Sequence, residues 1–287
     1  MDLSNKTVAL TGATGGIGLP LCREILKRNA NLILVDRNRE KSLNLRENLL
    51  KEFPTTTISH ITADLSDFKS VKEATQKLIQ SNIDFFIHNA GAYCIPRNIT
   101  ENGYDNVFHI NFVSPYYMIK KLIPTVKNNN GRFIVTGSIA HRYSKTDMSD
   151  FDFRTRKKAS LVYGNSKRFL MLSLYKLFED EQELLSVVHP GITFTGITNH
   201  YPKVIFALIK KPMKIIFMKP DKACLSTVMG IEKYTPYCTW IGPRVFDIWG
   251  KPKLTKLKFC EQEINDIYNK AEEVFYAENK EYKAVSF

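Results

Sequence analysis

Short apolar runs alternate with longer segments of helical periodicity along almost the whole chain. The runs are near-continuous in hydrophobic residues, as in residues 32–35, which is typical of strands that are covered on both faces. This alternation is the sequence form of repeated βα units around a parallel sheet. The chain is therefore predicted to be an α/β protein, with a doubly wound parallel sheet between two layers of helices.

About seven strands are expected, at residues 7–11, 32–36, 57–63, 83–88, 132–136, 185–189 and 239–241. Helices are predicted at residues 17–28, 39–53, 66–80, 104–127, 163–178, 221–234 and 262–279. No repeat, low-complexity tract or Pro/Ser-rich linker divides the sequence. Residues 1–287 are therefore expected to form a single domain.

Composition narrows the class of protein. With 44% hydrophobic and 24% charged residues, the chain is neither disordered nor fibrous. The five cysteines have no C-x-x-C spacing, which predicts neither a metal site nor a disulfide framework and favours the reducing cytoplasm. We expect no secretory signal and no transmembrane helix. The net charge of +12 favours anionic partners, but no nucleic-acid recognition motif accompanies it, so nucleic-acid binding is not expected.

The first predicted strand leads through a glycine-rich turn into a helix. Glycine allows a sharp turn and a close approach of the backbone to a pyrophosphate, and N–H groups at the helix start face the phosphate charge. A dinucleotide site is therefore predicted, with a ligand-free turn as the alternative. Its expected residues are Gly12, Thr14, Gly15, Gly16, Ile17 and Gly18.

The end of the second predicted strand bears on the choice of dinucleotide. The carboxylate of Asp36 can accept hydrogen bonds from the adenosine ribose hydroxyls, and its charge repels a 2'-phosphate. Arg37, the next residue, could instead pair with that phosphate. Because repulsion at hydrogen-bond range outweighs a flexible side chain that can turn to solvent, NAD is expected over NADP.

Tyr163 and Lys167 stand four residues apart at the start of a predicted helix, and so on one helix face. This spacing alone is common in surface helices. A free phenol has a pKa near 10, and a neighbouring ammonium and a positive nicotinamide ring would lower it. Tyr163 could then exchange a proton with a bound substrate.

These motifs occur in the order found in short-chain dehydrogenases/reductases, which the sequence resembles over about residues 5–280. The matching stretches are T-G-x-x-x-G-x-G from Thr11, Asn89-Ala90-Gly91, Ser138 and Tyr163-x-x-x-Lys167. The resemblance implies a Rossmann-type fold and hydride transfer between a nicotinamide dinucleotide and an alcohol/carbonyl pair. It makes Tyr163 the general acid/base and Lys167 the group that lowers its pKa.

The resemblance also assigns further site residues. Ser138 is expected to hold the substrate oxygen, and Asn111 to support a proton relay, although a helix Asn that only bonds backbone is the alternative. The remaining cofactor contacts that it implies are Asp64, Leu65, Asn89, Ala90, Gly91, Tyr163, Lys167, Pro190, Gly191, Ile192 and Thr195.

Some features depart from the common family pattern. His88 replaces a first Asn, and Gly137 stands where a second serine is frequent. Ser138 and Tyr163 are 25 residues apart (163 − 138), a long separation that resembles the branch of retinol dehydrogenases and related carbonyl reductases. An insertion at about residues 196–220, rich in aromatic and aliphatic residues, is expected to cover a lipophilic alcohol, ketone or aldehyde.

Several alternatives remain open at this level. A non-catalytic dinucleotide-binding sensor or scaffold would share the fold, although such proteins usually lack the Tyr or the Lys. The protein is expected to be cytoplasmic. A homodimer, and a peripheral contact of residues 196–220 with an anionic membrane through their lysines, are further hypotheses.

Overall fold

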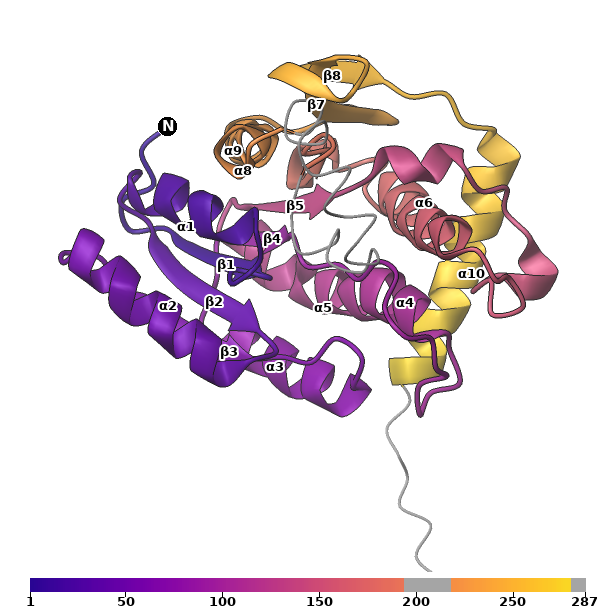
Figure 1. The fold of residues 1–287 in the computed structure, drawn as a ribbon, viewed down its shortest axis with the longest axis horizontal. Helices are drawn as coiled ribbons and strands as arrows, with labels where there is room; N and C mark the ends of the chain where they lie inside the picture. The colour runs from indigo at the N-terminus through magenta and orange to yellow at the C-terminus, as the bar shows by residue number, and fades with distance from the viewer. Residues whose placement is uncertain (194–217, 280–287) are drawn as a thin grey trace, which may run out of the picture.

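The structure is a computed structural model, and it describes residues 1–193 and 218–279. Its centre is an eight-stranded sheet of order β3-β2-β1-β4-β5-β6-β7-β8 (Figure 1). The strands are β1 (Thr7–Thr11), β2 (Asn31–Asp36), β3 (Ile58–Thr62), β4 (Phe85–His88), β5 (Arg132–Thr136), β6 (Leu185–Val188), β7 (Thr239–Val245) and β8 (Trp249–Lys256). All neighbours pair in parallel except β7 and β8, which are antiparallel.

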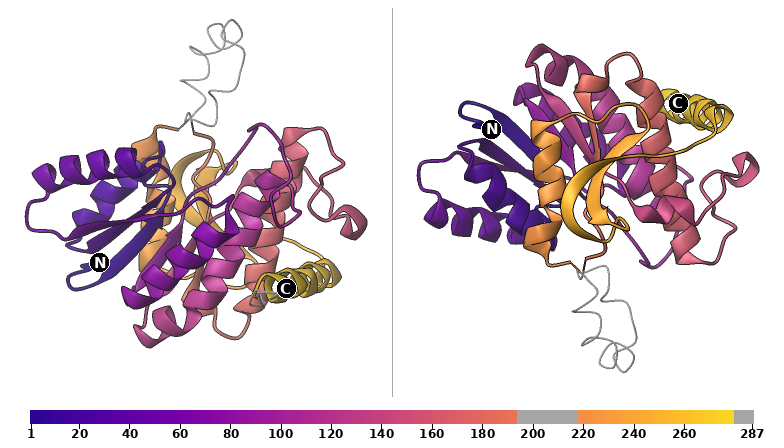
Figure 2. Two further views of the ribbon diagram at one scale, coloured as in Figure 1. Left: turned by 90° about the horizontal axis from the view of Figure 1, so that it is seen from below. Right: turned by 90° about the horizontal axis from the view of Figure 1, so that it is seen from above.

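Helices cover both faces of the sheet (Figures 1 and 2). One face carries α1 (Gly18–Leu26), α2 (Arg39–Glu52) and α9 (Leu225–Glu232), with the short α8 (Pro220–Ala223) before α9. The other carries α3 (Phe68–Gln80), α5 (Ser114–Asn128) and α6 (Ala159–Leu177), and α10 (Glu261–Asn279) packs outside α6 and α5. The predicted doubly wound Rossmann-type fold is confirmed, with its strand order reversing between β1 and β4.

The predicted count of about seven strands is one short, because β8 has no apolar run. Its sequence contains Lys251, Pro252, Lys253 and Lys256, and most of its residues are exposed or half-buried. Lysine and proline are typical of edge strands, which they protect from pairing with other chains. An edge strand therefore escapes a search for buried, near-continuous strands.

Three predicted helices also differ from the structure. The helix expected at residues 221–234 is divided into α8 and α9. The helix expected at residues 104–127 is divided into α4 (Asn106–Phe108), a π-helix (His109–Val113) and α5. The helix expected from Tyr163 begins at Ala159, after Lys158 in extended conformation, so Tyr163 lies in its second turn. Hydrophobic periodicity does not reveal a single π-turn, because the extra residue changes the register only locally.

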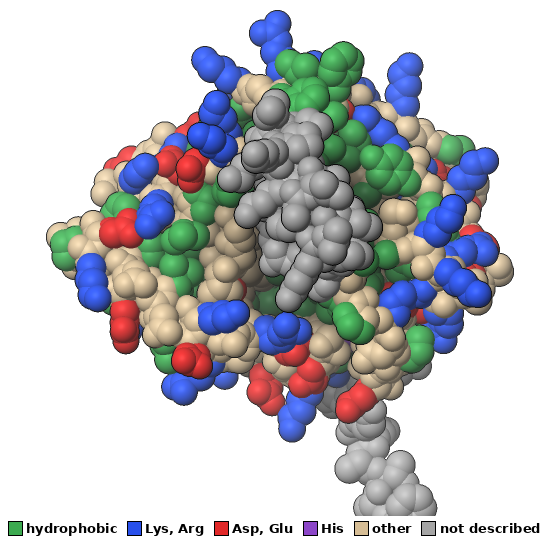
Figure 3. All heavy atoms as spheres, in the orientation of Figure 1, with side chains coloured by type: hydrophobic (Ala, Val, Ile, Leu, Met, Phe, Trp, Pro, Cys, Tyr) green, Lys and Arg blue, Asp and Glu red, His purple; other side chains and the backbone are tan. Residues whose placement is uncertain are grey.

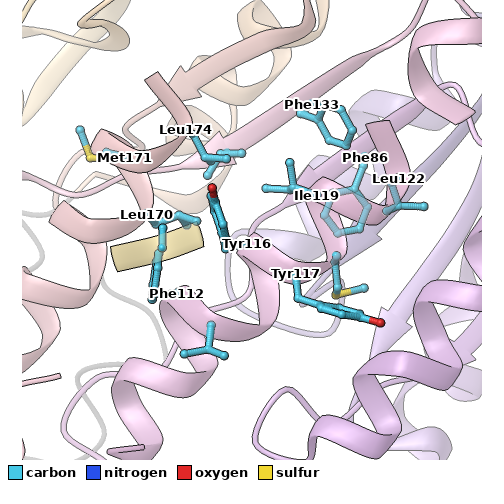
Figure 4. Close-up of a cluster of buried hydrophobic side chains, with 14 of the residues drawn as sticks. Phe86, Phe112, Tyr116, Tyr117, Ile119, Leu122, Phe133, Leu170, Met171 and Leu174 are labelled. Carbon is cyan, nitrogen blue, oxygen red and sulfur yellow. The ribbon is translucent and has the colours of Figure 1, made fainter. Parts of the chain in front are cut away.

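The core beneath α5 and α6 fixes the helix that carries Tyr163 and Lys167. Figure 4 shows its buried side chains: Phe86, Phe112, Tyr116, Tyr117, Ile119, Leu122, Phe133, Leu170, Met171 and Leu174. Phe86 of β4 and Phe133 of β5 meet edge to face, with ring centroids 6.4 Å apart. Each such side chain contributes roughly 1.5–3 kcal/mol by burial. The helix α6 is thus held firmly on the sheet.

No helix in the described ranges is both long and apolar enough to cross a membrane.

Candidate active site

The glycine-rich turn requires glycine at two positions. Gly12 has a φ of +71°, and a Cβ there would lie 3.0 Å from the Cα of Ala90. A Cβ on Gly18 would lie 2.3 Å from the carbonyl oxygen of Gly12, which is well inside contact distance. Gly18 therefore allows α1 to begin directly beneath the turn, while Gly12 lets the turn approach the loop after β4.

The hydroxyl of Thr11 ties this turn to the end of β4. It accepts hydrogen bonds from the N–H groups of Asn89 and Ala90, both at 3.1 Å. The amide of Asn89 donates in return to the carbonyl oxygens of Thr11 and Gly12, at 3.2 Å each. His88 is buried, and its Nδ1 lies 3.3 Å from the Thr11 hydroxyl. His88 thus supports the same junction in place of the Asn usual in the family pattern.

A cavity of about 460 Å³ opens beside this turn, at the carboxyl ends of β1, β2 and β4. It brings together most of the predicted cofactor residues: Gly12, Thr14, Gly15, Gly16, Ile17, Asp36, Arg37, Asp64, Leu65, Asn89, Ala90 and Gly91. Gly18 does not line the cavity and acts beneath it. Within the described part of the chain, no cluster of His, Cys, Asp or Glu could hold a metal ion.

Asp36 lines this cavity and is only 5% exposed. One carboxylate oxygen accepts hydrogen bonds from the N–H and the hydroxyl of Thr14, at 3.1 and 2.9 Å. The other accepts from the hydroxyl of Ser42 at 3.2 Å. These bonds fix a negative charge in the cavity wall and leave acceptor capacity for one more donor. Arg37, by contrast, is exposed at the cavity edge.

Asp64 serves the local structure as well as the cavity wall. Its carboxylate accepts from the N–H and the hydroxyl of Ser66, at 2.9 and 2.6 Å. This is an Asx-turn that leads into α3. The carbonyl oxygen of Leu65 accepts from Ser114 at 2.7 Å. Asp64 thus closes a local turn and lines the cavity, whereas the N-cap of α3 is Asp67.

Asn111 lies in the π-helix and is completely buried. Its amide holds both backbone groups of one residue in the loop after β4, accepting from the N–H of Ala92 and donating to its carbonyl oxygen, both at 2.8 Å. It also donates to the hydroxyl of Ser166 at 3.1 Å. The side chain therefore holds the active-site loop against α6, and the proton relay expected for Asn111 stays a prediction.

A second cavity, of about 410 Å³, contains the residues expected to act on the substrate. Its lining includes Ser138, Tyr163, Lys167, Pro190, Gly191 and Ile192. Ile17, Asn89, Gly91 and Tyr93 line both cavities, which are thus neighbours along one cleft. Thr195 and nearly all of the expected insertion at 196–220 lie outside the described residues.

The protonation of the site departs from the prediction. Burial raises the pKa of Tyr163, a hydrogen bond with Ser138 opposes this effect, and the neighbouring Tyr93 adds to it. Burial also lowers the pKa of Lys167 to about 8, and its ammonium donates to the carbonyl oxygen of Thr136 at 3.0 Å. Lys167 does not contribute to the change in the pKa of Tyr163. The expected lowering of the phenol pKa is therefore not produced by the residues of this chain, because burial dominates.

The family model of short chain dehydrogenases matches residues 6–203. The chain belongs to this family. It is an NAD(P)-dependent oxidoreductase acting on CH–OH groups, in the retinol dehydrogenase-like branch.

Curated relatives agree with this assignment, and a solved structure shares the fold. Human retinol dehydrogenase 13 is 30% identical over 209 residues, covering 69% of this chain and 62% of its own. The chloroplastic short-chain dehydrogenase TIC 32 A of Brassica napus is 29% identical over 216 residues, covering 70% and 68%. A crystal structure from Mycobacterium paratuberculosis has a TM-score of 0.72 at 20% identity, over 96% of this chain and 95% of that one, which shows a shared fold.

Tyr93 is a further residue of the dehydrogenase site, and no sequence motif predicts it. Its ring meets that of Tyr163 edge to face, with centroids 5.2 Å apart and planes at 78°. Tyr93 follows directly after Ala92, the residue that Asn111 clamps. The only sequence signal is its position two residues after the Asn89-Ala90-Gly91 motif. We therefore regard Tyr93 as a positioning residue for the Tyr163 ring.

Replacing Tyr93 by Ala in the dehydrogenase is expected to lower kcat/KM about two- to tenfold, since an edge-to-face pair is worth about 0.5–1.5 kcal/mol. Tyr93→Phe keeps the ring contact and should stay within about twofold of the wild type. Steady-state kinetics with one alcohol substrate provides the measurement. Equal losses in the Ala and Phe variants would show that the hydroxyl, and not the ring contact, is what matters.

Proposed function

We propose that this dehydrogenase transfers hydride between NAD and a lipophilic alcohol/carbonyl pair, with Tyr163 as the proton-transferring group. The observation that carries the proposal is the pair of adjoining cavities, which share Ile17, Asn89, Gly91 and Tyr93. One contains the glycine turn and Asp36, and the other contains Ser138, Tyr163 and Lys167. The adenosine and pyrophosphate fit the first cavity because glycine leaves its backbone open there.

When bound, the nicotinamide supplies or accepts the hydride. The raised pKa of Tyr163 keeps its phenol protonated at neutral pH, so it can donate a proton to a carbonyl oxygen during reduction. In oxidation, Tyr163 would react as the phenolate, which accepts the proton of the alcohol. Lys167, with a pKa near 8, can exchange protons close to neutral pH, and Ser138 orients the reacting oxygen. Bound nicotinamide, with its positive ring, is proposed to lower the phenol pKa and so favour the phenolate, while the lowering predicted from Lys167 is outweighed by burial in the free protein.

The preference for NAD rests on Asp36. Thr14 and Ser42 anchor its carboxylate, so the charge cannot swing away from an incoming 2'-phosphate. Arg37 is free to turn to solvent because it is exposed. Repulsion from a fixed, buried charge exceeds attraction to a mobile, solvated one.

Replacing Asp36 by Asn is expected to raise the ratio of kcat/KM for NADP to that for NAD by at least about tenfold. Asn removes the charge and keeps an oxygen for Thr14. Ser42→Ala is the matched control: it removes one hydrogen bond to the same carboxylate, keeps the charge and should leave NAD preferred. A wild-type enzyme that already uses NADP more efficiently would overturn this assignment.

The proposed lipophilic substrate rests on the walls of the second cavity. Tyr93, Ile139, Tyr143 and Ile192 line it beside the polar Ser138 and Tyr163. An apolar wall with few convergent polar groups is typical of a site for a lipophilic ligand. A panel of retinoid, steroid, aliphatic and aromatic alcohols and carbonyls, assayed with both dinucleotides, tests the proposal. Tight dinucleotide binding without turnover on any of them would favour the sensor or scaffold alternative.

A further inference from the structure

The hairpin of β7 and β8 carries large apolar side chains on its surface. Phe246 is 79% exposed, Val245 44% and Leu254 43%. Phe246 and Val245 stand next to each other at the turn between the strands. Figure 2, in its right-hand view, looks directly onto this hairpin. Exposed apolar groups that lie together indicate a contact surface.

The exposed charge of the same hairpin has one sign. Its exposed charged residues, with those of the segment just after β8, are Arg244, Lys251, Lys253, Lys256 and Lys258. The one acid between residues 239 and 259 is Asp247, which is buried and paired with Arg142 at 2.8 Å. Figure 3 shows hydrophobic and basic side chains together at the top of the molecule, where β7 and β8 lie. The surface is therefore both apolar and cationic.

The tip of the hairpin is held in a defined shape. Phe246 and Asp247 have φ values of 52° and 58°, which few residues other than glycine adopt. The ion pair of Asp247 with Arg142 and the hydrogen bond from Ile248 N–H to the Val245 carbonyl oxygen, at 2.9 Å, fix this turn. Phe246 is thus kept exposed by a turn that is anchored to the body of the protein.

The hairpin also adjoins the catalytic cavity. A Cβ on Gly191, which lines that cavity, would lie 2.7 Å from the carbonyl oxygen of Ile248 and 3.0 Å from Cγ of Pro243. Trp240 of β7 stacks on His189, another lining residue, with ring centroids 4.8 Å apart. A surface bound by the hairpin would therefore lie close to the substrate site.

We propose that the β7–β8 hairpin docks on an anionic lipid surface, with Phe246 and Val245 entering the interface and the basic residues facing lipid phosphates. The combination of apolar side chains and uniformly positive charge matches such an interface. A nucleic-acid surface fits less well, because stacking requires a series of exposed aromatic rings and the tip offers Phe246 alone. Docking would place the substrate site close to lipophilic compounds in the membrane. This consequence rests on the proposed function, whereas the binding to lipid does not.

The test is sedimentation of the full-length protein with phosphatidylcholine vesicles, with and without phosphatidylglycerol. Binding is expected only to anionic vesicles and is expected to decrease as salt increases. The double variant Val245→Ser/Phe246→Ser should lose at least about tenfold in vesicle affinity. The double variant Lys251→Gln/Lys253→Gln should bind vesicles more weakly, and its binding should depend less steeply on salt concentration.

Matched controls are available elsewhere on the surface. Tyr276→Ser removes an aromatic side chain that is 59% exposed on α10, and Lys51→Gln/Lys69→Gln removes two exposed charges on α2 and α3. Both controls should bind vesicles as the wild type does. All variants should keep their affinity for dinucleotide, which shows that they are folded.

Three results would overturn the proposal: no sedimentation of the wild type at low salt, unchanged binding by both hairpin variants, or loss of binding only in Lys210→Gln/Lys211→Gln, which changes two lysines of the predicted insertion at residues 196–220. Complete displacement from vesicles by an oligonucleotide would also contradict it and favour a nucleic-acid partner. A wild type that sediments as predicted but turns over no substrate would contradict the proposed function alone. The two proposals can thus fail separately.

Discussion

Tyr163→Phe is expected to lower turnover by at least about a hundredfold while dinucleotide affinity stays close to that of the wild type. The substitution removes the hydroxyl that exchanges a proton with the substrate oxygen and keeps the ring that meets Tyr93 edge to face. The loss should appear in kcat and in kcat/KM together, since proton transfer occurs only in the transition state. Steady-state kinetics and a direct measurement of dinucleotide binding together provide the check.

Tyr143→Phe is the matched control, because Tyr143 lines the same cavity but is 57% exposed at its edge. This control should keep most of the activity. If Tyr163→Phe retained more than about a third of the wild-type rate, Tyr163 would lose its assigned role.

Lowering the pH from about 6.5 to about 4 is expected to destabilise the fold by several kcal/mol. Burial lowers the pKa of His109, His141 and His189 to about 4, and that of His88 well below its ordinary value. Between these values and 6.5 the unfolded chain binds more protons, so stability falls as the pH falls. A shift from 6.5 to about 4 corresponds to roughly 3 kcal/mol for each histidine. The sum is comparable with the whole stability of a typical domain.

Chemical denaturation at a series of pH values measures this effect. His109→Phe should reduce the pH dependence of the unfolding free energy by about one proton, because it removes one buried histidine. A Phe ring should fit this position, since the His109 ring already lies against Tyr104 and Phe68, at centroid distances of 6.0 and 5.9 Å. His60 is only half-buried, and His60→Gln is expected to change the slope less. A free energy of unfolding that stays constant between pH 6.5 and 4 would show that the buried histidines are not neutral in the fold.

Local sequence patterns are sufficient to predict the central strands of the sheet and most of the residues at their ends. The bounds of β1 and β5 are those predicted, because both are apolar runs buried between helical layers. The predicted site residues that directly follow parallel strands do lie close together. The reason is that the carboxyl ends of parallel strands share one edge of the sheet. Asp36, Asn89 and Gly91 thus line one cavity although they are distant in sequence.

Other features depend on contacts that no local pattern encodes. The pairing of Tyr93 with Tyr163 joins residues 70 positions apart (163 − 93), and its geometry follows from how the loop after β4 is clamped. The direction of the Tyr163 pKa shift depends on burial, which motif spacing does not report. The strand β8 was missed because an edge strand needs no apolar run.

Hydride transfer itself provides the most direct test of the central claim. The enzyme is incubated with NAD and a panel of lipophilic alcohols deuterated at the carbinol carbon, and the nicotinamide product is analysed by mass spectrometry. The wild type is predicted to transfer deuterium from at least one alcohol to the nicotinamide ring, and Tyr163→Phe to do so at least about a hundredfold more slowly. A wild type that binds NAD and transfers no label from any alcohol, or a Tyr163→Phe variant that transfers it undiminished, would contradict the account.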